Sequence, residues 1–116
     1  MLAFLLGIVP LAQNAAATTP EQVKEFVHNI YIEGVPYDEA SQLAADVALP
    51  VLKQVLDDPG EDEYWANAAI TIGMIGNDQG VNLLTEFVNR QEAKSKLTRA
   101  QTVAKTSAVI ALGYIV

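Results

Sequence analysis

Residues 64–84 read Y-W-A-N-A-A-I-T-I-G-M-I-G-N-D-Q-G-V-N-L-L. An apolar helix is expected to end at Gly76, and a second helix begins within five residues of that glycine. Two apolar helices joined by so short a turn cannot cover all of their own hydrophobic surface, so such hairpins normally stack against copies of themselves. The stretch therefore predicts an all-α fold, an α-solenoid of stacked antiparallel helix pairs.

An internal repeat extends this pattern in both directions. Residues 46–52 align with residues 78–84 at a shift of 32. Residues 68–75 align with residues 108–115 at a shift of 40, because a polar insertion, Arg90 to Arg99, lengthens the second unit. Units of about 32 to 40 residues with two helices each are typical of α-solenoids.

The helix that follows the break at residues 57–60 is apolar on most sides. Its inward stripe is expected to consist of Trp65, Ala68, Ala69, Ile72 and Ile75. Asn67 and Thr71 form a thin polar line on the same helix. Gly73 and Gly113 recur at equivalent places in the repeat, and each is predicted to let an adjacent helix approach closely because glycine has no Cβ.

Capping signals place the first helix of this region. The sequence T-P-E-Q at residues 19–22 is a capping box with proline at the first helical position. Gly34 and Pro36 end the segment, so the helix is predicted over residues 20–33.

The next boundaries are less sharply marked. A second helical stretch starts at residue 38, and its boundary within residues 38–50 stays open, with Asp46 as a candidate N-cap. Pro50 either kinks the helix or lies near its first turn. Glu61 or Asp62 is expected to cap the helix that follows the acidic turn.

Composition limits the function classes. The chain has 116 residues, of which 51% are hydrophobic and 18% charged, as expected for one folded domain. A net charge of −7 with only seven basic residues argues against nucleic-acid binding. Residues 21–86 hold thirteen of the fourteen acids, whereas residues 87–116 hold five of the seven bases. This asymmetry either guides end-to-end association or reflects two differently solvated surfaces.

The N-terminal 17 residues resemble a signal peptide. Residues 2–12 form an apolar run that is too short to span a bilayer, so no stable membrane insertion is expected. Ala15 and Ala17 fit the A-x-A pattern with cleavage before Thr18, which predicts export to the periplasm or the extracellular space. No lysine or arginine precedes the run. The alternative is a buried first helix of a cytoplasmic array.

The repeat region resembles a known family. The sequence I-G-M-I-G-N-D-Q-G-V-N-L-L at residues 72–84, with A-L-P-V-L-K-Q-V-L before it and A-V-I-A-L-G-Y-I-V after it, is similar to HEAT-type repeats, of a bacterial exported type, over residues 46–116. The pattern departs from the family at Asn77 and Asp78, where Asp-Pro is usual, and at Ala66 and Asn67, where an arginine is common. The resemblance implies a right-handed stack of antiparallel helix pairs that serves as a binding surface, and it implies no chemistry by itself.

No catalytic, cofactor-binding or metal-binding constellation stands out in the sequence. His28 is the only histidine, and the chain has no cysteine to pair with it. The acidic turn at residues 57–63 lacks the alternating ligand order of a calcium loop. We therefore predict a non-enzymatic interaction or scaffold module with a protein or peptide partner. The alternatives are a bilin-lyase-like HEAT subunit and an accessory arm of a larger enzyme.

Candidate contact residues combine aromatic anchors, the thin polar line and the basic insertion. They are Tyr31, Tyr37, Tyr64, Asn67, Thr71, Arg90, Lys94 and Lys96. The last helix stops at Val116 without a glycine cap, which predicts that residues 18–116 are a C-terminally truncated repeat domain. If the chain is complete, self-association is expected through Val109, Leu112 and Ile115 of this helix.

Overall fold

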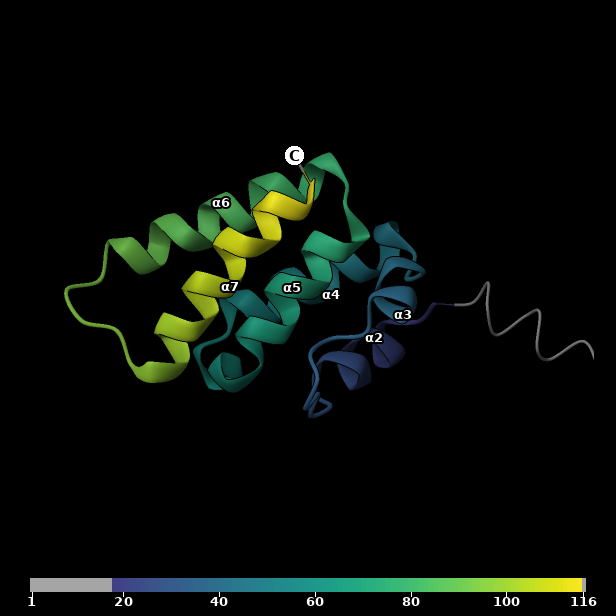
Figure 1. Cartoon of the computed structure of the whole chain (residues 1–116), viewed down its shortest axis with the longest axis horizontal. Helices are drawn as coiled ribbons and strands as arrows, with labels where there is room; N and C mark the ends of the chain where they lie inside the picture. The colour runs from purple at the N-terminus through teal and green to yellow at the C-terminus, as the bar shows by residue number, and fades with distance from the viewer. Residues whose placement is uncertain (1–17, 116) are drawn as a thin grey trace, which may run out of the picture.

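The computed structural model describes residues 18–115, and this part of the chain is all-helical with no strand, which confirms the all-α part of the prediction (Figure 1). The α-helices are α2 (Pro20–Val27), α3 (Tyr37–Ser41), α4 (Ala45–Asp57), α5 (Trp65–Ile75), α6 (Asp78–Glu92) and α7 (Arg99–Ile115). A 3-10 helix, η1 (Pro59–Tyr64), joins α4 to α5. The predicted signal peptide, residues 1–17, lies outside the described residues.

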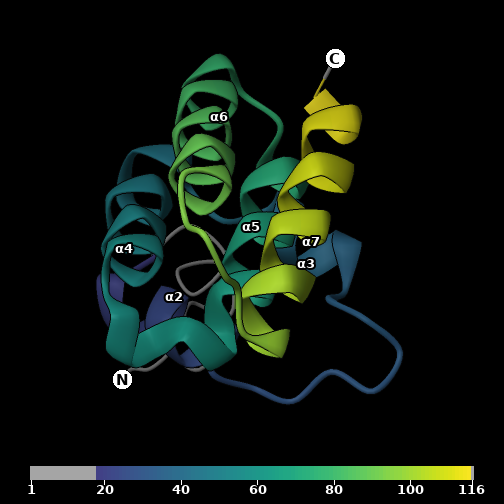
Figure 2. The same ribbon diagram turned by 90° about the vertical axis from the view of Figure 1, so that its left-hand side faces the viewer.

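The helices from α4 onward form two hairpins, α4–α5 and α6–α7. Figure 2 shows α4 beside α6 and α5 beside α7, and each of these pairs is in contact. The α5–α7 contact is the most extensive helix contact among residues 18–115. Helices α2 and α3 pack at the other side of this unit, against α4 and α5 respectively. Among residues 18–115, no helix has the length and apolar character needed to cross a membrane.

The core lies between these helices and consists mostly of small and branched side chains. Its largest fully buried apolar members are Phe87, Leu52, Ile72, Leu84, Val23, Val27 and Val55. The inward side of α7 contributes only alanines, Ala104, Ala108 and Ala111, and all three are fully buried. Small side chains on one helix allow the neighbouring helix to come close. The core therefore brings α5 and α7 together at short range.

Trp65 belongs to the core, as predicted. Its side chain is almost fully buried, and its ring packs edge-on against Phe87 with 5.2 Å between the ring centroids. The indole N–H donates to the backbone carbonyl of Val55 at 2.8 Å and to that of Asp58 at 3.2 Å. The tryptophan therefore ties the end of α4 to the start of α5.

Several predicted helix ends are confirmed. The Thr19 hydroxyl accepts from the amide of Gln22, and the Gln22 side chain accepts from the amide of Thr19, which completes the capping box. Gly76 ends α5 with φ of 77°, a left-handed conformation that glycine adopts without strain. The Asn77 side chain then accepts from the amide of Gly80 and caps α6.

The first helix is shorter than predicted. It ends at Val27 and not near residue 33. The Tyr31 hydroxyl donates to the carbonyl of Phe26 at 2.5 Å, and the Asn67 side chain donates to the carbonyl of Val27 at 2.9 Å. These two donors satisfy carbonyls that the last helical turn leaves unpaired, so the chain can leave the helix early.

Three other predicted boundaries are wrong. The N-cap of α4 is Ala44, and Asp46 lies inside the first turn, with Pro50 farther along the same helix. Neither Glu61 nor Asp62 caps α5, because both lie in η1. The insertion is also shorter than expected, since α6 continues to Glu92 and leaves only residues 93–98 outside the helices.

The two equivalent glycines differ in their surroundings. A Cβ placed on Gly73 would lie 2.7 Å from the Cβ of Ala111 and 2.8 Å from its backbone oxygen, so α5 and α7 meet at this glycine. The prediction of a close helix approach is confirmed there. It is wrong for Gly113 within residues 18–115, because a Cβ at Gly113 would meet no atom within 4 Å.

Candidate functional site

The α2–α3 loop and the start of α5 enclose an open hollow of about 350 Å³. It is lined by His28, Asn29, Ile30, Tyr31, Glu63, Tyr64 and Asn67. Three of the predicted contact residues, Tyr31, Tyr64 and Asn67, therefore lie together, although Tyr31 is more than 30 residues from the other two in sequence. Ile30 lines it with 90% of its side chain exposed, and Ile32 in the same loop is 94% exposed. The hollow is a candidate contact surface for an apolar peptide.

The polar atoms of this hollow are largely engaged within the chain. The Tyr64 ring packs against the His28 ring at a tilt of 37° with 4.3 Å between centroids, and His28 Nε2 lies 2.9 Å from Glu61 Oε1. The Tyr31 hydroxyl is used at the end of α2. The Tyr31 contact fixes the loop on α2, and the His28 contacts fix the end of α2 on η1.

The side chains of Asn67 and Thr71 donate hydrogen bonds to backbone carbonyls within the chain. The Asn67 side chain donates to the carbonyls of Val27, at 2.9 Å, and Asn29, at 3.1 Å. Thr71 is fully buried, and its hydroxyl donates to the carbonyl of Asn67 at 2.7 Å. Thr71 therefore cannot reach a partner in this structure, which corrects its prediction as a contact residue.

Replacing Asn67 with alanine is expected to lower the free energy of unfolding by about 1–2 kcal/mol, because two backbone carbonyls lose their donor. Hydrogen exchange should quicken in residues 28–36 more than in α6. Urea denaturation and hydrogen-exchange mass spectrometry measure the two effects. Asn67→Asp keeps the shape and cannot donate, so it should destabilise at least as much; a stable aspartate variant would contradict this role.

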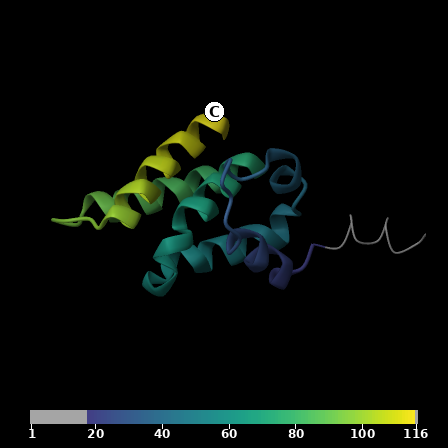
Figure 3. The same ribbon diagram turned by 60° about the horizontal axis from the view of Figure 1, so that its bottom comes forward.

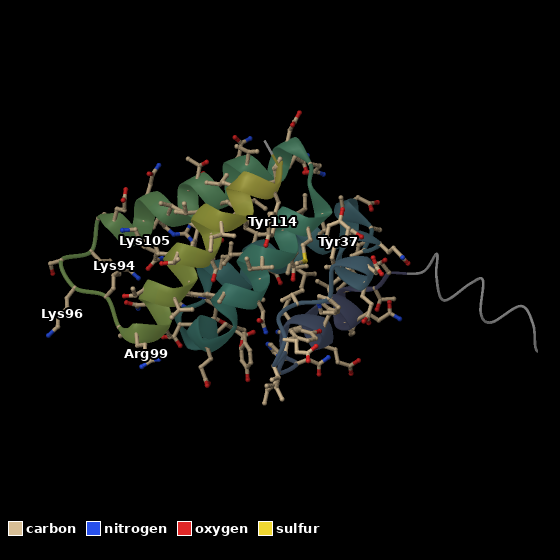
Figure 4. All side chains as sticks on the ribbon, in the orientation of Figure 1. Tyr37, Lys94, Lys96, Arg99, Lys105 and Tyr114 are labelled. Atoms are coloured by element: carbon tan, nitrogen blue, oxygen red, sulfur yellow. The ribbon has the colours of Figure 1, made fainter. Side chains whose placement is uncertain are left out.

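Of the basic candidates, Arg90 and Lys94 make contacts within the chain, whereas Lys96 is exposed. Arg90 Nη1 lies 3.1 Å from Asp57 Oδ1, and its Nη2 donates to the carbonyl of Leu56 at 3.2 Å, which closes the end of α4. Lys94 donates to the buried side chain of Gln91 and lies over the Trp65 ring. Lys96 and Tyr37 are exposed, and Figure 4 shows them at different ends of the molecule. No single surface collects the predicted contact residues.

The outer face of α7 is the most continuous exposed apolar surface of the described chain. Its exposed fractions are 49% for Val103, 53% for Val109, 50% for Ile110 and 54% for Tyr114. Thr102, Thr106 and Gly113 fill the space between them and are also exposed. The charged side chain of Lys105 lies elsewhere, with its Nζ 3.4 Å from Glu92 Oε2 on α6. We call these seven residues, from Thr102 to Tyr114, the outer α7 face.

Figure 3 shows α7 at the edge of the helical array, with the rest of the described chain on one side of it only. From the sequence we expected self-association through Val109, Leu112 and Ile115 of this helix. Val109 lies on the outer α7 face. Leu112 and Ile115 pack against the core and are not on this face. The amphipathic pattern of α7 is ambiguous, because alanine fills its buried side and larger apolar residues fill its exposed side.

The described residues, 18–115, contain no cluster of three or more His, Asp or Glu side chains that would hold a metal ion. The acidic turn is instead occupied with chain contacts, since the Asp58 side chain accepts from the amide of Gly60 at 2.8 Å. Comparison with protein-family models, curated proteins and solved structures found no match for this chain.

Proposed function

We propose that this protein is a non-enzymatic interaction module in which α4–α5 and α6–α7 are successive units of a HEAT-like α-solenoid. In this proposal the outer α7 face binds a helix of a protein partner. The observation that supports it most directly concerns two equivalent helix faces. One side of α5 packs against α7, whereas the equivalent side of α7 is exposed.

The covered face lies on α5. Gly73 meets Ala111 of α7, and Ala66 lines a hollow together with Ala100 and Val103 of α7. At helical spacing, this side of α5 carries Ala66, Ala69, Ile70 and Gly73. A shift of 40 residues places Thr106, Val109, Ile110 and Gly113 on the matching side of α7. These four residues belong to the outer α7 face, so the surface that receives α7 on one unit recurs uncovered on the next.

An uncovered copy of a helix-binding surface favours an interaction role. Four half-exposed apolar side chains on the outer α7 face gain stability when another apolar surface removes them from water. A helical partner fits this face because a helix already occupies the equivalent face of α5.

Ile110→Glu tests the proposal. A carboxylate in the middle of the outer α7 face should abolish retention of a partner from an extract of the native source, because its burial is unfavourable. The side chain of Ile110 is half exposed, so circular dichroism should show an intact fold. Ile32→Glu is the matched control, since it makes the same change at a residue that is 94% exposed in the α2–α3 loop.

Wild type and Ile32→Glu should retain the same proteins in this comparison, and Ile110→Glu should lose them. Retention of the same proteins by Ile110→Glu would contradict the assignment of the binding surface to α7. If only Ile32→Glu failed to retain these proteins, the binding surface would be the hollow at Tyr31 and Tyr64 and not the outer α7 face.

A further inference from the structure

We propose that the helix bound by the outer α7 face is α7 of a second copy of this chain, with the two helices antiparallel and related by a two-fold axis. This inference rests on the proposed function of that face as a helix-binding surface. It adds the identity of the partner and the register of the contact.

The outer α7 face is complementary to itself in one antiparallel register. When the two-fold axis passes at the level of Ala108, Val103 of one copy lies level with Gly113 of the second copy. In the same register Ile110 lies level with Thr106 of the second copy, and Tyr114 with Thr102 of the second copy. Each large side chain then lies level with a small one, which is the requirement for dense packing of two helices.

Gly113 provides the depression that this register fills. Nothing lies within 4 Å of the position where its Cβ would be. Val103 of the second copy enters beside Ile110 and Tyr114, as a side chain of one helix enters the gap between residues of another. The α5–α7 contact uses the same device, because Gly73 there receives Ala111.

A hollow on α7 and α5 receives the aromatic side chain. Its volume is about 480 Å³, and it is lined by Asp62, Glu63, Ala66, Arg99, Ala100 and Val103. In the proposed register Tyr114 of the second copy lies level with Thr102, on the side of α7 that carries Ala100 and Val103. The ring packs on the alanine side chains there, and the carboxylates at the rim accept from its hydroxyl.

The charges near the contact also favour an antiparallel pair. The seven residues of the outer α7 face are uncharged. Arg99, at the first position of α7, lies beside the C-terminal end of α7 of the second copy, where the helix carries unpaired carbonyls and partial negative charge. A parallel pair would place the two arginines together instead.

The contact is small. One face of a 17-residue helix, about 25 Å long, buries less than the ~800 Å² per partner of a standard interface. The dimer is therefore weak and should be populated only at protein concentrations of about 100 µM and above.

Directed disulfide formation tests both the partner and the register. The chain has no cysteine, so Val103→Cys and Gly113→Cys each introduce a single thiol. Both positions are exposed, and circular dichroism should show that both variants fold. Oxidation of a mixture of the two variants should give about tenfold more cross-linked dimer than oxidation of either alone, because only unlike positions come within disulfide range. Two cysteines at position 103 would lie about 15 Å apart along the axis.

Two controls complete this experiment. A mixture of Ile32→Cys and Gly113→Cys measures random collision, because Ile32 is nearly fully exposed and lies outside the outer α7 face. Adding Ile110→Glu to both cysteine variants should reduce cross-linking to the level of this control. Sedimentation of the wild type should show a dimer that persists in 0.5 M salt, a concentration at which surface charge attraction is largely screened (Debye length roughly 4 Å).

The outcomes separate the inference from the proposed function. Equal cross-linking of the Gly113→Cys variant with itself would overturn the antiparallel register. Open-ended oligomers that salt disperses would indicate that the basic end binds the acidic end of another copy, and they would overturn the two-fold pair. A monomer at all concentrations, combined with partner loss in Ile110→Glu, would overturn this inference and leave the proposed function standing. A monomer at all concentrations, with the partner still retained by Ile110→Glu, would contradict both this inference and the proposed function.

Discussion

Replacing Trp65 with alanine is expected to lower the free energy of unfolding by about 3–5 kcal/mol, the largest effect of any substitution considered for this chain. The side chain is 3% exposed, and it joins α4, α5 and α6. Its removal leaves a cavity against Phe87 and takes the indole donor from the carbonyls of Val55 and Asp58. Urea denaturation followed by far-ultraviolet circular dichroism measures the loss without requiring tryptophan fluorescence.

Trp65→Phe separates the two contributions. Phenylalanine keeps most of the ring volume and lacks the N–H, so a loss of about 1 kcal/mol is expected from the missing indole hydrogen bonds, since the carbonyls of Val55 and Asp58 keep their backbone donors. The rest of the alanine effect then belongs to packing. Equal losses in both variants would contradict this division, and an alanine variant with wild-type stability would show that Trp65 does not hold the two hairpins together.

Replacing Gly73 with alanine is expected to destabilise the fold by about 2 kcal/mol, although alanine is the better helix former. The new methyl group would lie 2.8 Å from the backbone oxygen of Ala111, so α5 and α7 must separate. This separation affects the most extensive helix contact among residues 18–115. Thermal and urea denaturation at low protein concentration measure the change.

Gly113→Ala is the matched control for that substitution. It makes the same change at the equivalent position of the repeat, where the methyl group meets no atom within 4 Å. Stability should stay the same or rise by up to about 1 kcal/mol, because alanine favours the helix. Opposite signs at the two glycines are therefore expected. Equal effects would show that the α5–α7 approach is not limited at Gly73.

Features that depend on neighbouring residues could be predicted from the sequence. The capping box at residues 19–22 and the left-handed glycine at Gly76 follow from local chemistry, and both are present in the structure. The burial of Trp65 follows from helical periodicity. In each case the signal lies within one or two helical turns, so no knowledge of distant contacts was needed.

Features that depend on distant contacts could not be predicted. The early end of α2 requires Asn67, which is 40 residues from Val27 in the sequence and supplies a donor to its carbonyl. The same contact explains why Asn67 is part of the scaffold. Arg90 is likewise engaged at the end of α4, 34 residues away from Leu56. Polar residues that look available in the sequence are occupied once the helices pack.

The sequence by itself determined the helical class, the capping box at residues 19–22 and the glycine end of α5, because these follow from periodicity and local hydrogen bonding. Only the tertiary structure decided which side of α7 is covered. The alanine side packs inward, since small side chains allow the close α5–α7 approach at Gly73, and the larger apolar residues are left outside. Hydrophobicity alone would have placed the larger residues in the core, and the geometry of helix contact reverses that order.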